Sequence, residues 1–248
     1  MQLQPAWPFK ELTANNFDLG DIDRTFMTKG VLVTSKPEKK PAFRGVMHKY
    51  AFFASIPAAL FLIYQSPNLK VFWPILIYSL SLMALLGTSA LYHRINWTDK
   101  YRDTMGTLDR TMIYFFIAGS FTPFAVLSME GTVPFVVLSI LWSSVIFGAV
   151  INFFWYSAPT WIHALLYLLV SWLCIFALPQ LWENLGSDGL FWVFFGGILY
   201  SVGAIVYATK FPNPWPKTFG FHEVFHCFVT VGVAIHYAVI AAYLIPSA

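Results

Sequence analysis

Seven stretches of mostly apolar residues constrain this chain more than any other feature. A helix that crosses the roughly 30 Å hydrocarbon core needs about 20 apolar residues, because each residue adds about 1.5 Å. The alternating ten-residue segments of a closed β-barrel, the other fold that can span lipid, are missing. The sequence therefore predicts an all-α protein, a bundle of seven transmembrane helices at approximately residues 47–64, 71–92, 109–128, 133–154, 161–179, 190–209 and 221–245.

The composition supports lipid as the solvent and excludes two other classes. Charged residues make up 11% of the 248 residues and hydrophobic residues 58%, whereas a soluble domain has about a quarter charged residues. A net charge of +3 without a basic stripe argues against nucleic-acid binding. Cys174 and Cys227 both lie inside apolar runs, which argues against a disulfide framework.

The distribution of Lys and Arg predicts the orientation in the membrane. Fourteen of the 15 lie before or at the start of the first run, between the second run and the start of the third, or before the seventh; the remaining one is Lys70. Cytosolic loops carry the excess of Lys and Arg. We therefore expect a cytosolic N-terminal segment over 1–45, as a surface helix or loose chain, and a seven-helix domain over 46–248 with an extracellular C-terminus. The expected location is the plasma membrane.

Two histidines at the start of the last run indicate a metal site. His222 and His226 are four residues apart, so on a helix they share a face with about 5–6 Å between their Cβ atoms. Such a pair can bind one metal ion, or can be two interfacial histidines. His93 ends the second run on the same side of the membrane. Three protein ligands with one open position are typical of catalytic zinc.

Asp109 and Ser89 complete the candidate site. Asp109 begins the third run on the cytosolic side, where its carboxylate could orient a ligand histidine or bond to water at the metal. The alternative is an acid at a helix N-terminus. Ser89 lies one turn before His93 and could bond to a water in the site or to its own backbone.

The other histidines are weaker candidates. His48 and His163 lie near cytosolic helix ends, where interfacial placement explains them, with His163 as a reserve ligand. His236 follows His222 by fourteen residues, about 21 Å along a helix. That distance is too long for a shared metal, so we expect a packing role.

The segment from His222 to His226 also reads as HExxH, the zinc-protease motif in which Glu223 would be the general base. This short pattern often occurs by chance. The usual downstream third ligand is missing, because no Asp or Glu follows Glu223. A membrane-embedded protease with its third ligand on another helix stays an alternative.

Taken together, these residues resemble the hemolysin III / progestin and adipoQ receptor (PAQR) family. The resemblance runs from Arg44 to the C-terminus; its main motifs are Ser89 to His93, Asp109-Arg110, Ala118 to Pro123, and His222-xxx-His226 with His236. It implies a seven-helix bundle with a cytosolic N-terminus and zinc held by His93, His222 and His226, with Asp109 close to water at the metal. Proteins of this pattern include hormone receptors, ceramide-cleaving enzymes and bacterial hemolysins.

The leading hypothesis is a zinc-dependent hydrolase of a membrane-lipid amide or ester, similar to a ceramidase. Asp109 would be the general base and Ser89 would orient water or the oxyanion. The first alternative is a receptor-like or signalling protein with a structural zinc site, closed by a fourth ligand such as His163 or Cys227. The second is a cytolytic or pore-forming hemolysin.

Overall fold

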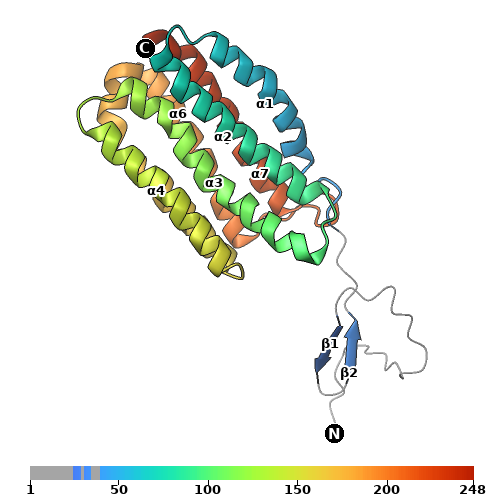
Figure 1. Cartoon of the computed structure of the whole chain (residues 1–248). Helices are drawn as coiled ribbons and strands as arrows, with labels where there is room; N and C mark the ends of the chain where they lie inside the picture. Colours follow the sequence, from blue (N-terminus) through green and yellow to red (C-terminus); the bar gives the residue numbers. More distant parts are fainter. Residues whose placement is uncertain (1–24, 29–30, 35–39) are drawn as a thin grey trace. The chain divides into compact units, whose positions relative to one another are not determined.

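The computed structural model describes residues 25–28, 31–34 and 40–248, which fall into two units, Met1–Lys40 and Pro41–Ala248 (Figure 1). In the first unit, β1 (Thr25–Thr28) and β2 (Val31–Thr34) form an antiparallel pair with Thr25 opposite Thr34. The sequence predicted a surface helix or loose chain here, so the hairpin differs from that expectation. The rest of the predicted N-terminal segment up to residue 39 lies outside the described residues.

The second unit is a helical bundle in which α1 to α4 pack in sequence, as do α5 to α7, and α7 returns to lie against α1 (Figure 1). A 3₁₀ turn joins α5 to α6, and a π-helical turn extends α7. The elements are α1 (Val46–Tyr64), α2 (Leu69–Arg94), α3 (Asp99–Ser128), α4 (Val133–Phe154), α5 (Thr160–Trp172), η2 (Leu173–Ala177), α6 (Leu178–Thr209), α7 (Phe221–Val239), η3 (Ile240–Leu244) and α8 (Ile245–Ser247).

Six helical stretches in the described residues are long and apolar enough to cross a membrane. Their outer faces expose large apolar side chains such as Phe135, Phe153 and Phe176, while Leu62 and Tyr78 are buried between the helices. Apolar residues on the outside are expected where lipid replaces water. The prediction of a bundle of membrane-length apolar helices is confirmed for the second unit, while the number of crossings and the orientation stay predictions.

The fifth stretch, Thr160–Thr209, is 50 residues long and combines the two predicted runs 161–179 and 190–209. Gly186 interrupts it with φ 65° and ψ −177°, a conformation that glycine adopts without a steric penalty. Trp172, which lies before this break, contacts two residues that lie after it. Its Nε1 donates a hydrogen bond to Ser201 Oγ at 3.1 Å, and its ring packs edge-on against Phe194. The chain therefore folds back on itself near Gly186, inside the predicted 186–189 connection.

The start of α3 corrects one predicted boundary. We expected the third helix to begin at Asp109, but it begins at Asp99. Polar and charged residues fill these first turns, so an apolar-run criterion misses them although they favour helix. Lys100 and Arg102 thus lie on the helix and not in a loop, and Asp109 lies ten residues inside it. The alternative reading of Asp109 as a helix-terminal acid is therefore wrong.

A close contact between α6 and α7 gives a test of the packing. A Cβ atom added to Gly196 would lie 2.5 Å from Nε2 of His236, whereas one added to Gly197 would meet no atom within 4 Å. We expect Gly196→Ala to lower the free energy of unfolding by about 1–3 kcal/mol through overpacking. Gly197→Ala, the matched control, should leave it unchanged or slightly higher. Thermal unfolding of the detergent-purified protein measures both; equal effects would contradict this contact.

Candidate metal centre

The structure brings three of the predicted site residues together. His93 lies in the last turn of α2, and His222 and His226 lie on consecutive turns at the start of α7. One ring nitrogen of each lies within 4.8 Å of the other two. The Nε2 atoms of His93 and His222 are 3.1 Å apart. His93 and His226 are buried, so this group could hold a metal ion between two helices that are far apart in sequence.

The start of α7 is fixed by Glu223, which lies between the two histidines in sequence. Its Oε2 accepts a hydrogen bond from the Gly220 backbone N–H at 2.7 Å, which caps the helix. Its Oε1 forms an ion pair with Nε of Arg44, just before α1, at 2.5 Å. Both carboxylate oxygens of this buried residue are thus engaged in structural contacts, an arrangement that does not favour Glu223 as the base of a protease.

Asp109 lies beside the histidine group, as the sequence predicted. Its Oδ2 is 3.6 Å from Nε2 of His93. Ser89 is buried one turn before His93, with its hydroxyl within hydrogen-bonding reach of the Asp109 carboxylate. Three helices, α2, α3 and α7, therefore contribute to one polar cluster of three imidazoles, one carboxylate and one hydroxyl.

One distance between donor atoms is close to that expected in a tetrahedral zinc site. Two nitrogens that bind one tetrahedral zinc ion at about 2.0–2.1 Å are about 3.3 Å apart, close to the 3.1 Å between His93 and His222. The carboxylate oxygen of Asp109 lies 3.6 Å from His93 Nε2, so it adjoins the three imidazoles. The donor set of three imidazoles with an adjacent carboxylate is chemically suited to this metal.

His48 is the residue that the sequence reasoning undervalued. Its ring is 3% exposed and stacks on His226 with 3.8 Å between centroids and 5° between planes. It is a buried neighbour of the metal candidates and not a histidine at a lipid interface. The sequence could have indicated this placement, because His48 is the third residue of the first helix and so lies at the same membrane depth as His226.

The remaining candidates lie outside the group. Cys227 directs its thiol to the Met47 sulfur at 3.4 Å. His163 is buried on α5 and stacks on Tyr167, so neither supplies a fourth ligand in this structure. His236 faces the carbonyl of Val193 with Nε2 at 3.0 Å. Its predicted packing role, distant from the three histidines, agrees with this contact.

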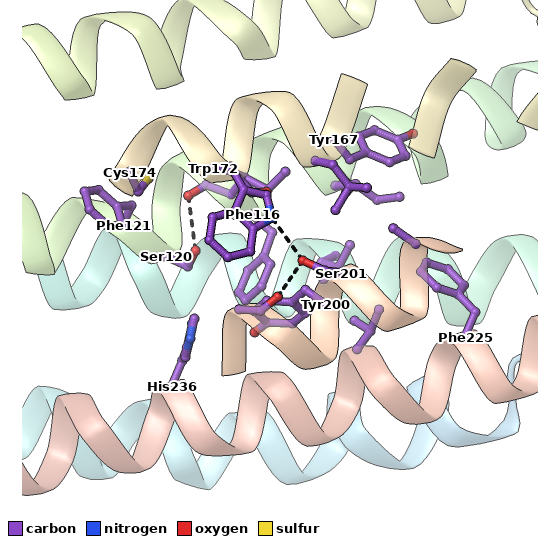
Figure 2. A pocket seen from close by; sticks show the side chains of 18 of the residues that line it. Phe116, Ser120, Phe121, Tyr167, Trp172, Cys174, Tyr200, Ser201, Phe225 and His236 are labelled. Atoms are coloured by element: carbon purple, nitrogen blue, oxygen red, sulfur yellow. Dashed lines mark hydrogen bonds between the residues drawn. The ribbon is translucent and has the colours of Figure 1, made fainter. Parts of the chain in front are cut away.

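An apolar cavity of about 200 Å³ adjoins the cluster and continues between α3, α5, α6 and α7. Asp109, His222 and His226 line it, together with mostly aromatic and aliphatic side chains. Figure 2 shows Tyr167 and Phe225 toward one end of this pocket and His236 and Phe121 toward the other. The polar cluster thus opens onto an elongated space whose walls suit a hydrocarbon chain.

Comparisons with known proteins give one family match and several relatives. A family model described as Haemolysin-III related matches residues 37–237. The hemolysin-3 homolog of Bacillus subtilis is 33% identical over 210 residues, covering 84% of this chain and 95% of the relative. Hemolysin-3 of Bacillus cereus is 30% identical over 225 residues, covering 90% and 100%. The monocyte to macrophage differentiation factor of Homo sapiens is 26% identical over 172 residues, covering 68% and 69%.

Proposed function

Because the chain belongs to the haemolysin-III related family, a family of membrane proteins, we propose that it is a zinc-dependent hydrolase of a membrane-lipid amide or ester. The observation that carries the proposal is the group of three histidines with Asp109 beside it, opening onto an apolar cavity. A metal site of this kind next to a hydrocarbon-lined space is suited to an acyl bond at the end of a lipid chain.

His93, His222 and His226 would hold the zinc ion. When bound, zinc lowers the pKa of water toward about 7 and polarises a carbonyl group. The buried His48 ring, stacked on His226, would keep that imidazole in one orientation. The Arg44–Glu223 ion pair would hold the first turn of α7, and with it His222, against the start of α1.

Asp109 would be the general base and then the general acid. Its carboxylate lies 3.6 Å from His93 Nε2 and on the wall of the cavity, so it can reach a water next to the scissile carbonyl. It would take the proton from that water and return it to the leaving amine or alcohol. Ser89 would donate a hydrogen bond to the carboxylate and fix its orientation, or stabilise the developing oxyanion.

The substrate would be a membrane lipid that enters from the bilayer. The cavity is lined by apolar side chains such as Phe116, Phe121 and Phe194. They would exclude water from the acyl chain and place its carbonyl end near Asp109. Ceramide-like amides and acyl esters both consist of a long hydrocarbon chain and a polar end.

We propose that the chain crosses the plasma membrane seven times. The break at Gly186 and the contact between Trp172 and Ser201 support two crossings within Thr160–Thr209. Lys and Arg are concentrated before α1, at the end of α2 and in the first turns of α3, and before α7. Together with the seven crossings, this distribution favours a cytosolic N-terminus and an extracellular C-terminus. The metal site would then lie on the cytosolic side.

One observation favours a second candidate, a receptor-like or signalling protein with a structural zinc site. The Asp109 oxygen is close enough to His93 that a small movement would make it the fourth ligand. Such a closed site would tie α2, α3 and α7 together without catalysis. The hemolysin names of the two Bacillus relatives suggest a third candidate, a cytolysin.

The purified full-length protein distinguishes these functions. We expect about one zinc ion per chain by mass spectrometry and release of fatty acid from ceramide or another acyl lipid, with both lost after chelation and restored by zinc. Stoichiometric zinc without hydrolysis across a panel of acyl lipids would overturn the hydrolase and favour the structural site. Ion conductance in reconstituted bilayers, again without hydrolysis, would favour the cytolysin.

A further inference from the structure

The loop between α6 and α7 exposes two large aromatic side chains. Phe211 is 73% exposed and Trp215 is 65% exposed. The loop follows Thr209 and precedes Phe221, which end and begin stretches long and apolar enough to cross a membrane. It therefore lies at a membrane surface in either orientation of the protein. Large apolar groups that are exposed outside the membrane-length helices indicate an interaction site.

Hydrogen bonds give this loop a defined conformation. The backbone N–H of Trp215 donates to the Phe219 carbonyl at 3.0 Å, and the N–H of Phe219 donates back to the Trp215 carbonyl at 2.7 Å. Oδ1 of Asn213 accepts a hydrogen bond from the backbone N–H of Phe221 at 3.1 Å. The exposed rings are therefore presented by a folded turn that is joined to the start of α7.

Three exposed cations accompany these rings. Lys210 and Lys217 belong to the loop itself. The backbone N–H of Ala42 donates to the Lys217 carbonyl at 3.2 Å, and Nη1 of Arg94 donates to the Ala42 carbonyl at 3.4 Å. The end of α2 thus brings a guanidinium beside the loop. Neither ion pair formed by the described residues includes one of these three cations.

The loop contains no acid that could neutralise them. No Asp or Glu occurs between Asp188 and Glu223 in the sequence. Glu223 is buried and is already paired with Arg44. The result is a surface with positive charge and exposed aromatic rings side by side, which we call the basic–aromatic surface. Its members are Arg94, Lys210, Phe211, Trp215 and Lys217.

From this arrangement we propose that the basic–aromatic surface binds the head group of an anionic phospholipid of the surrounding bilayer. Lys and Arg near a membrane surface attract anionic lipids, and a phosphate accepts charge-assisted hydrogen bonds from both. Trp side chains favour the depth of the head groups, where their rings contact the first part of the acyl chains. The surface lies outside the cavity, so this binding goes beyond the proposed hydrolysis.

The test compares phosphatidylglycerol with phosphatidylcholine of the same acyl chains. Native mass spectrometry of the detergent-purified full-length protein counts the copies of each lipid retained during a titration. The wild-type protein should prefer phosphatidylglycerol. A cation near a membrane surface contributes about fivefold to the affinity for anionic lipid. Lys210→Gln and Lys217→Gln should therefore each weaken phosphatidylglycerol binding by about fivefold and leave phosphatidylcholine unchanged.

The aromatic part of the surface is tested by Trp215→Ala. The ring would contact a part of the lipid that both phospholipids share, so this variant should weaken the binding of both by a similar factor. Its exposure to 65% means that the substitution should leave thermal unfolding unchanged. Unchanged binding of both lipids would overturn the proposal.

The matched control is Lys70→Gln, an exposed lysine at the other end of α2, which should leave the binding of both lipids unchanged. A loss of phosphatidylglycerol equal to that of the loop variants would show an effect of net charge alone and overturn the site. Equal retention of the two lipids by the wild-type protein would overturn it too and leave the surface to a soluble protein partner. Because lipid retention is the readout, failure of zinc binding or hydrolysis leaves this result intact.

Discussion

Replacing His222 by alanine is expected to remove most of the bound zinc from the purified protein. Changes in residues that only orient zinc ligands weaken metal binding by about 10–100-fold, so loss of a direct ligand should cost at least about 100-fold. His222 supplies one of three ring nitrogens that lie within 4.8 Å of one another. Zinc content by mass spectrometry after dialysis against a weak chelator measures the effect.

His236→Ala is the matched control, because it removes a histidine from the same helix. Its Nε2 faces the backbone carbonyl of Val193, so this variant should keep its zinc although its stability falls. Equal zinc loss in the two variants would contradict the assignment of ligands. Retention of zinc by His222→Ala would contradict it as well.

Replacing Asp109 by asparagine is expected to remove nearly all hydrolysis while zinc stays bound. The amide keeps the shape of the carboxylate and its position 3.6 Å from His93, but it cannot accept a proton. General acid–base catalysis typically contributes about 10²–10⁴-fold to the rate, so the turnover of an acyl lipid should fall by that factor. Fatty-acid release, normalised to zinc content, measures it.

Glu223→Gln is the control for this variant, because Glu223 is the base in the competing HExxH interpretation. Its oxygens contact Gly220 and Arg44, so we expect lower stability but retained turnover per zinc. Turnover retained by Asp109→Asn and lost in Glu223→Gln would move the base to Glu223 and favour a protease-like site. Zinc loss from Asp109→Asn would instead favour the carboxylate as a structural ligand.

The helical fold could be predicted because membrane helices have a length requirement that apolar runs reveal directly. The helix boundaries could not be predicted accurately where a helix continues beyond its apolar residues. Residues 99–108 are polar, so the run began at Asp109 although α3 begins at Asp99. The glycine in the predicted 186–189 connection marked the break correctly, but the helix resumes at once and leaves no loop.

The grouping of His93, His222 and His226 could be predicted because it depends on two properties, helical spacing and membrane depth, that the sequence reveals. The contacts around the group could not. The stack of His48 on His226, the ion pair of Arg44 with Glu223 and the place of Arg110 on the cavity wall depend on how helices rotate against one another. The spacing of residues within one helix does not determine how that helix rotates against its neighbours.

The separation of the metal candidates along the chain has a consequence for biosynthesis. His93 and His222 are 129 residues apart and lie on the second helix and on α7. A chain that has been synthesised and inserted only as far as α6 holds one of the three imidazoles and lacks the other two. High-affinity capture of the proposed metal would therefore await α7, and metal content would then mark completed assembly in the membrane.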